Sequence, residues 1–151
     1  MVREFERYHG IALNRLVHGI GTGICIETYP TPSNSSYVVN LSNSRKRVGI
    51  YIKYSTSRLS PWKFSFKKEH QEEIKEMQEI LGKVAILFVC HEDGIAALSY
   101  EELTEILDGE FRGTEYVGIW RNPREKYLVK GTDGKLSKKI GENEFPFKLF
   151  S

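Results

Sequence analysis

Acidic residues are absent from a long part of this chain. The forty-one residues from Thr28 to Lys68 include neither Asp nor Glu, although these two types make up 20 of the 151 residues overall. The same run has eight basic residues and no carboxylate to balance them, so its net charge is +8. A segment of one charge sign attracts ligands of the opposite sign, and we expect anions to bind there. The basic residues are Arg45, Lys46, Arg47, Lys53, Arg58, Lys63, Lys67 and Lys68.

Cysteine is scarce, and long apolar runs are absent. The two cysteines, Cys25 and Cys90, each lie in an apolar run, which predicts buried thiols rather than a disulfide or a metal site. No apolar run approaches the roughly 20 residues that span a bilayer. The first residues lack the apolar core of a secretion signal. We therefore expect a cytoplasmic protein with no membrane partner.

The charges that are present are segregated along the chain. The whole sequence has a net charge of only +2, but residues 69–120 sum to −10 and residues 121–151 sum to +4. Such segregation predicts a surface with separate basic and acidic regions. The basic region is a candidate for binding anions, and the acidic region is a candidate for binding a basic partner.

Length and composition favour one globular domain. A chain of 151 residues with 40% apolar content is long enough to bury a single core. Changes in hydrophobic periodicity then predict the order of elements. We expect a helix at 5–16, strands at 24–29, 37–41 and 48–55, a long helix at 66–81, strands at 84–89 and 95–98, a short helix at 99–107, and strands at 116–120 and 127–129.

Two strands in this order have distinct patterns. Residues 48–55 alternate, so one side is predicted to face a core and the other to face outward through Tyr51 and Lys53. Residues 84–89 are apolar at every position, which is typical of a central parallel strand covered on both faces. The segment between them is therefore predicted to be a right-handed crossover that contains the long helix.

The segments 36–41 (Ser-Tyr-Val-Val-Asn-Leu) and 49–55 (Gly-Ile-Tyr-Ile-Lys-Tyr-Ser) are the second and third strands of an order helix, three strands, helix, strand. From about Glu4 to Val89 this order resembles the core of the PD-(D/E)XK, or restriction-endonuclease-like, superfamily, nearest to Holliday-junction-resolvase-like nucleases. The resemblance implies an α/β fold with an αβββαβ core, a mixed sheet flanked by helices, and a C-terminal β extension. Residues 1–98 would form the nuclease-like core and residues 99–151 a helix plus the β extension.

The resemblance also implies an active-site position whose motif is degenerate in this chain. In that superfamily the second strand begins with a proline-aspartate pair, and the third strand has a glutamate and, two residues later, a lysine. Here Tyr37 stands at the position of the aspartate, Tyr51 stands at the position of the glutamate, and Lys53 alone matches. By the resemblance, Lys53 is the candidate catalytic residue, and the two tyrosines mark the positions of the missing acids.

Magnesium chemistry makes this departure important. Mg²⁺ binds carboxylates, water and phosphate oxygens, and it supplies the activated water for phosphodiester cleavage. A tyrosine is protonated at neutral pH and does not replace a carboxylate. An alternative ligand set would be Glu6, Glu27 and Glu69. The histidines show no paired zinc spacing except His9 with the distant His18. We therefore predict no metal or other cofactor, with Mg²⁺ bound only if the protein is an active nuclease.

The remaining features favour holding a nucleic acid over cutting it. Lys67 and Lys68 lie in the first turn of the predicted long helix, where an anion would offset their unfavourable interaction with the helix dipole. Tyr54 and Trp62 lie among the basic residues and provide rings that can stack on bases, although for Trp62 and Phe64 a loop packed on the core is the slightly favoured explanation. We predict a non-cleaving, nuclease-like protein that binds the phosphate backbone through residues 45–68.

Two alternatives remain open at this stage. The first is a protein-interaction or regulatory domain that uses the acidic region from Glu69 to Glu115 against a basic partner or a second copy of the chain. The second is a magnesium-dependent endonuclease with a rearranged site. Divalent-dependent cleavage that is abolished by Lys53→Ala would favour the second alternative.

Overall fold

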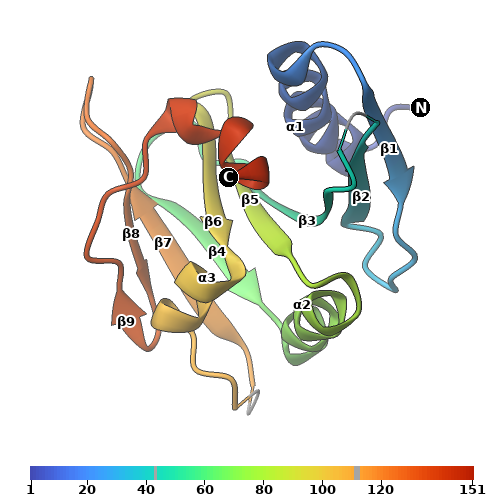
Figure 1. The fold of residues 1–151 in the computed structure, drawn as a ribbon. Coiled ribbons are helices and arrows are strands. Elements are labelled where there is room, and N and C mark those ends of the chain that lie inside the picture. Colours follow the sequence, from blue (N-terminus) through green and yellow to red (C-terminus); the bar gives the residue numbers. More distant parts are fainter. Residues whose placement is uncertain (43, 111–112) are drawn as a thin grey trace.

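The computed structural model describes residues 1–42, 44–110 and 113–151. Its elements form three layers, with a five-stranded sheet in the middle (Figure 1). One face of this sheet is covered by α1 and the C-terminal segment, and the other face by α2, α3 and a second sheet. The fold is therefore α/β, as predicted. No helix in the described ranges is long and apolar enough to cross a membrane.

The first sheet has the strand order β1-β2-β3-β5-β6. Strands β3 and β5 are parallel, and every other neighbouring pair is antiparallel. A parallel pair needs a crossover connection, which α2 provides. The predicted parallel pair with the long helix in its connection is thus confirmed, and its right-handed sense stays a prediction. The elements are β1 (Ile24–Thr28), β2 (Ser36–Leu41), β3 (Arg47–Ser55), α2 (Lys68–Leu81), β5 (Val84–Cys90) and β6 (Gly94–Ser99).

Strand β5 is buried along its whole length. Its side chains alternate between the two cores of the molecule: Ile86 and Phe88 belong to the core beneath α2 and the second sheet, whereas Leu87 and Val89 belong to the core beneath α1. A strand that packs on both faces needs apolar residues at every position. The uninterrupted apolar run from Val84 therefore correctly predicted the centre of the fold.

Helix α1 (Glu4–Ile20) packs on the first sheet through one stripe of side chains. Tyr8, Ala12 and Leu16 are buried on that stripe, as their spacing predicts. The C-terminal segment covers the rest of the same face with Phe145 and Leu149. This segment includes the short 3-10 helices η1 (Glu142–Glu144) and η2 (Phe147–Phe150).

The second sheet has the order β4-β7-β8-β9, and all its pairs are antiparallel. The predicted C-terminal β extension is present, but β4 comes from the first segment, so the sheet joins residues 1–98 to residues 99–151. Helix α3, which precedes β7, begins at the predicted capping box, in which Ser99 and Glu102 exchange hydrogen bonds. The elements are β4 (Trp62–Phe66), α3 (Tyr100–Ile106), β7 (Glu115–Trp120), β8 (Leu128–Gly131) and β9 (Gly134–Lys135).

Strand β4 corrects the predicted start of the long helix. Residues 62–66 alternate between buried and exposed and pair with β7, and the helix begins only at Lys68. Phe66 fits the helical stripe of α2 and also the two-residue period of Trp62, Phe64 and Phe66, which explains the error. Pairing with β7, which is distant in sequence, selects the strand.

Strand β3 corrects a second expectation. Its predicted outward side is covered, because Tyr51 has no exposed surface and Gly49 is also buried. Helix α2 approaches the strand closely, and a Cβ atom at Gly49 would lie 2.7 Å from a methyl carbon of Leu81. Glycine at this position therefore permits α2 to cover the face that the alternating pattern assigned to solvent.

The two cysteines lie in different environments. Cys90 is buried at the end of β5, as predicted, but Cys25 is exposed. Cys25 lies on β1, which is an edge strand of the first sheet and is incompletely covered. The expectation of two buried thiols is therefore wrong for Cys25.

The two-sided burial of β5 leads to a stability prediction. Ile86→Ala removes a fully buried side chain between two packed layers and should lower the free energy of unfolding by about 2–5 kcal/mol. Ile80→Ala, at an exposed position of α2, is the matched control and should change it by less than about 0.5 kcal/mol. Urea denaturation measures both values, and equal losses would contradict the described packing.

Candidate functional site

A carboxylate from α2 lies at the centre of the candidate site. The hydroxyl groups of Tyr51 and Ser33 each donate a hydrogen bond to Oε2 of Glu73 at 2.7 Å, and the backbone N–H of Ser33 donates to Oε1 at 3.2 Å. Glu73 and Tyr51 are buried. Burial raises the pKa of Tyr51 well above its ordinary value, so its phenol stays protonated and acts as a donor. The carboxylate is thus held by three neutral donors.

Lys53 lies two residues further along the same face of β3. Its Nζ atom is 3.3 Å from Nδ1 of His70 and 4.8 Å from the centroid of the Phe66 ring. The backbone N–H of Lys67 also donates to His70 Nδ1, at 3.2 Å. His70 Nδ1 therefore accepts, which requires a neutral imidazole with its proton on Nε2.

Burial changes the pKa values of both Lys53 and His70. Desolvation lowers the pKa of Lys53 to about 8, while the charge of Glu73 acts in the opposite direction and the charge of Lys67 acts in the same direction. Burial and the Lys53 charge both lower the pKa of His70. At neutral pH the site thus contains a protonated lysine that is close to its titration, together with a neutral histidine.

The structure separates Tyr37 from this site. Tyr37 pairs with Ile50 and lies on the α1 side of the sheet, where its hydroxyl is 2.9 Å from Nδ1 of His9. Tyr51 pairs instead with Ser36. Neighbouring residues of a strand point to opposite faces, so the assignment of Tyr37 to the face of Tyr51 and Lys53 is wrong by one residue. Ser36 lies at the corresponding position.

The alternative metal ligands are not brought together. Within the described part of the chain, only Asp108, Glu115 and Asp133 form a group of three acidic, histidine or cysteine side chains whose ligand atoms lie within 4.8 Å of one another. Glu6, Glu27 and Glu69 therefore do not make such a group. A hard divalent cation prefers carboxylate oxygens, so the set of donors at Asp108, Glu115 and Asp133 suits one. Asp108 follows α3, Glu115 begins β7, and Asp133 lies in the turn between β8 and β9.

In this acidic group (Asp108, Glu115 and Asp133), the two aspartates affect the ionisation of Glu115. Burial, and then the nearby charges of Asp133 and Asp108, raise the pKa of Glu115 to about 7. Its Oε2 atom is buried and has no hydrogen-bond partner in the part of the chain that the structure describes. The carboxylate of Glu115 is thus in an environment that opposes its negative charge.

The basic residues of segment 45–68 do not form one patch. Arg45, Lys46 and Arg47 lie before or at the start of β3, whereas Arg58 follows its end, and a nine-residue strand is roughly 27 Å long. Lys46 donates to the backbone oxygen of Phe150. The predicted binding surface is therefore divided between two ends of the first sheet.

Most of the remaining basic residues of the segment lie near Lys53, toward the end of β3. Lys67 is close enough to Lys53 to affect its pKa, and Lys68 follows at the first position of α2, 3.9 Å from Glu72. Lys63 is exposed on the second sheet, and β4 connects it directly to Lys67. We call Lys53, Lys67 and Lys68 the lysine group.

The rings predicted to stack on bases are not available for that purpose. Trp62 is only 2% exposed, and its Nε1 donates to the backbone oxygen of Ser57. Tyr54 stacks on Tyr8 with ring centroids 4.6 Å apart and lies on the α1 side of the sheet. The simpler explanation, packing on the core, holds for Trp62 and Phe64, although they belong to a strand and not to a loop.

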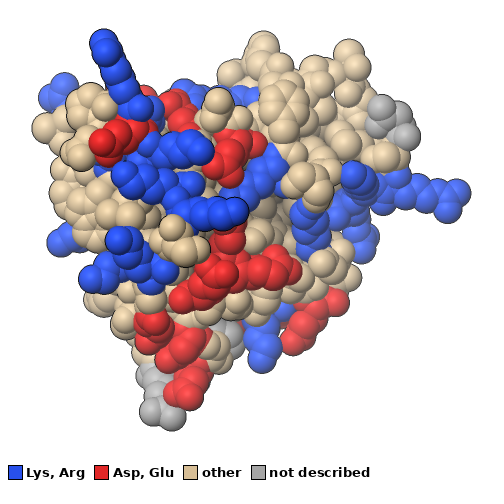
Figure 2. All heavy atoms as spheres, turned by 60° about the vertical axis from the view of Figure 1, so that its left-hand side comes forward, with Lys and Arg blue, Asp and Glu red and all other residues tan. Residues whose placement is uncertain are grey.

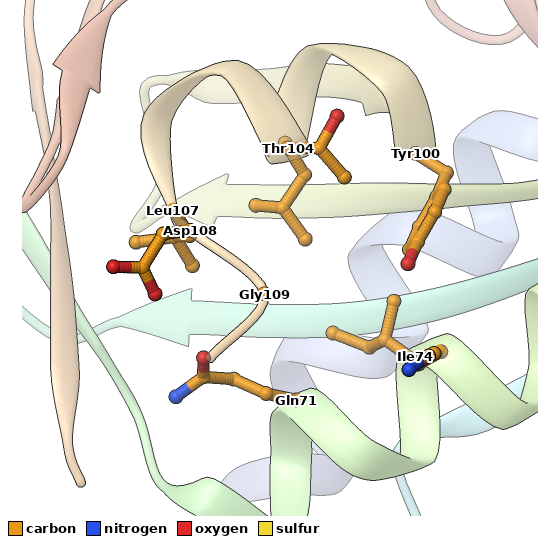
Figure 3. A pocket seen from close by; sticks show the side chains of 9 residues that line it. Gln71, Ile74, Tyr100, Thr104, Leu107, Asp108 and Gly109 are labelled. Atoms are coloured by element: carbon orange, nitrogen blue, oxygen red, sulfur yellow. The ribbon is translucent and has the colours of Figure 1, made fainter. Parts of the chain in front are cut away.

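A separate groove lies between α2 and α3. Figure 3 shows Gln71 and Ile74 of α2 facing Tyr100 and Thr104 of α3 across it. The Nε2 group of Gln71 donates to the backbone oxygen of Phe66, but Oε1 has no partner in the described ranges. The groove could hold a small apolar molecule that donates one hydrogen bond.

No protein-family model, curated protein or solved structure matches this chain. The function must therefore be inferred from the side chains and their geometry, because a fold alone hosts many functions.

Sequence reasoning missed Glu73, the carboxylate at the centre of the candidate site. The available signal was its place one residue before Ile74 on the inner stripe of α2, next to a predicted strand. Glutamate at such a position is usually solvated, and only the pairing of α2 with Tyr51 and Ser33 shows that it is buried.

The described surroundings of Lys53 predict its titration. Its ammonium group should lose a proton at about pH 8, below the ordinary value of 10.5. Glu73→Gln should lower that pKa further, because the negative charge of Glu73 favours the charged form of Lys53. NMR titration of the lysine Cε resonances, with Lys53 assigned through Lys53→Arg, measures both. A midpoint near 10.5 in the unsubstituted protein would contradict this environment.

The raised pKa of Glu115 predicts a pH-dependent stability. Ionisation is less favourable in the folded state, so the contribution of Glu115 to stability falls as pH rises from about 4.5 to about 7. Glu115→Gln should therefore raise Tm at pH 8 and change it little near pH 4. Thermal unfolding at both pH values tests this, with Glu105→Gln as a control for the removal of one negative charge. A Tm increase of equal size at both pH values would contradict the acidic group.

Proposed function

We propose that this protein binds nucleic acid through its phosphate backbone at the lysine group, without cleaving it. One observation carries the proposal: Lys53 lies close enough to Lys67 and Glu73 for both charges to affect its pKa, and the oxygens of Glu73 already accept three hydrogen bonds. The arrangement offers positive charge to a phosphate but no set of acids for a metal. Binding is therefore favoured over hydrolysis.

The order of elements supports a nuclease-like origin. Helix α1, the antiparallel strands β1, β2 and β3, the crossover helix α2 and the parallel strand β5 follow the αβββαβ order of the restriction-endonuclease-like core. Strand β4 is an addition between β3 and α2. In this comparison Lys53 lies on the third strand of the core, where the superfamily has its lysine.

The residues at the acid positions near Lys53 argue against cleavage. Mg²⁺-dependent hydrolysis requires carboxylates that bind the metal and position the attacking water. Tyr51 occupies one acid position as a neutral phenol, and Ser36 lies opposite it on β2. The oxygens of Glu73 accept three hydrogen bonds from Tyr51 and Ser33, and a metal would compete with these donors.

The first turn of α2 favours an anion. Lys67 is the N-cap residue and has no side-chain capping bond in the described structure. Backbone N–H groups at a helix start lack intrahelical acceptors, and each lysine there is unfavourable by about 0.3–1 kcal/mol because of the helix dipole. A phosphate would accept from these N–H groups and offset the lysine charges.

Salt dependence tests the proposed binding. Affinity for a labelled duplex or single strand should fall steeply as salt rises, because binding to phosphates releases counterions. The double substitution Lys67→Gln/Lys68→Gln should weaken binding and reduce the slope of log K against log salt by about 1 for each lysine–phosphate pair that it removes. Fluorescence anisotropy at several salt concentrations measures both.

Arg45→Gln/Arg47→Gln is the matched control, since it removes two charges at the other end of β3. It should leave the slope nearly unchanged. Absent binding at low salt, or affinity that does not vary with salt, would reject the proposal. Incubation with Mg²⁺ should leave the labelled strands intact, and cleavage that Lys53→Ala abolishes would establish a magnesium nuclease instead.

A further inference from the structure

The outer face of the second sheet presents a row of lysines. The register places Lys63 opposite Gly118, Gly118 opposite Lys130, and Lys130 opposite Lys135. Residues directly opposite each other point to the same face of a sheet, so the three lysine side chains share one face, and all three are exposed. With strands about 4.8 Å apart, the row crosses roughly 14 Å of surface.

Two exposed aromatic residues flank the middle of this row. Tyr116 and Trp120 lie two residues before and after Gly118, hence on the same face, and are 58% and 36% exposed. The ring of Trp120 lies over Gly118, because a Cβ atom built there would be 2.6 Å from its Cη2 atom. The indole thus occupies the gap between Lys63 and Lys130.

These aromatic residues are not required for the core. Val117 and Ile119, which alternate with them on β7, have no exposed surface and already fill the inner face of the sheet. Tyr116 and Trp120 also line a shallow hollow together with Lys63 and Lys130. Exposed aromatic residues that share a concave surface with cations mark an interaction site more often than a structural one.

We propose that this face binds a single strand of nucleic acid, with Tyr116 and Trp120 stacked on its bases and Lys63, Lys130 and Lys135 paired with its phosphates. Stacking platforms with nearby cations are the usual means of holding single strands, because every base has an aromatic face. The inference rests on the proposed function and adds to it a second surface and a strand type. Lys63, at the edge of this face, is linked through β4 to Lys67 of the lysine group.

The charges around the platform limit the path of the strand. Figure 2 brings the side of the molecule with β8 and β9 forward and shows Lys and Arg side chains gathered above a concentration of Asp and Glu side chains. Glu115 and Asp133 lie at the start of β7 and in the turn between β8 and β9. Glu115 alternates with Tyr116 and points to the inner face of the sheet, so the strand should follow the lysine row across the outer face. A duplex would not fit this role, because its bases are already stacked inside the helix.

Binding of oligothymidine of about 20 nucleotides, compared with a duplex of equal length, tests this inference. The single strand should bind more tightly and should quench tryptophan fluorescence. Of the two tryptophans, Trp62 is buried, so the quenching reports on Trp120. Tyr116→Leu and Trp120→Leu should each weaken binding of the single strand about 5- to 150-fold. Phe147→Leu, at another exposed aromatic residue, is the matched control and should bind as the unsubstituted protein does.

Circular dichroism and Tm of each variant show whether it is folded, and Gly118→Val provides a second route to the same test. A side chain at position 118 would displace the Trp120 ring without removing any ring or charge, so it should weaken single-strand binding as well. The inference is overturned if the folded variants bind the single strand as the unsubstituted protein does, or if the duplex binds more tightly and tryptophan fluorescence stays constant. Absence of all binding by the unsubstituted protein would instead reject the proposed function.

Discussion

The carboxylate of Glu73 determines the arrangement of the candidate site. Its hydrogen bonds from Tyr51 and Ser33 join α2 to β3 and to the loop before β2. Hydrogen bonds to a charged group contribute about 1.5–3 kcal/mol each, so these contacts fix the position of α2 along the sheet. His70 and Lys67 lie one to two turns before Glu73 and are thereby placed beside Lys53.

The same interaction supports the proposal that the site binds an anion rather than a metal. The negative charge of Glu73 favours the protonated form of Lys53, and the Glu73 oxygens already accept three hydrogen bonds from neutral donors. Strand β4 then leads from the first turn of α2 to the exposed lysines and rings of the second sheet. Phosphate binding and base stacking would thus occur on surfaces that one short strand connects.

Much of the fold could be predicted from periodicity, because burial on one or two faces leaves a direct pattern in the sequence. The stripe of α1, the apolar run of β5 and the capping box at Ser99 are examples. Strand β4 was missed because Phe66 fits both the helical stripe of α2 and the two-residue period of Trp62 and Phe64. Pairing with β7, about 50 residues away, decides between the two patterns and cannot be read from the local sequence.

The candidate site was less predictable, since it depends on which side of each strand a residue faces. Lys53 was identified as a candidate from the third strand, but Tyr37 was placed on the wrong face. A shift of one residue in register turns every side chain of a strand to the opposite face of the sheet. The charges of segment 45–68 could be counted from the sequence, but the sequence did not show that the length of β3 separates them. The platform around Trp120 required the register of four strands that are not consecutive in sequence.

The most direct test of nucleic-acid binding by these surfaces is an NMR titration of the isotope-labelled protein with oligothymidine. We expect the backbone amide shifts to change at Lys67 and Lys68 at the start of α2 and at Tyr116, Gly118 and Trp120 on β7, while amides of α1 stay constant. Changes confined to the groove between α2 and α3, or no changes at low salt, would contradict the account.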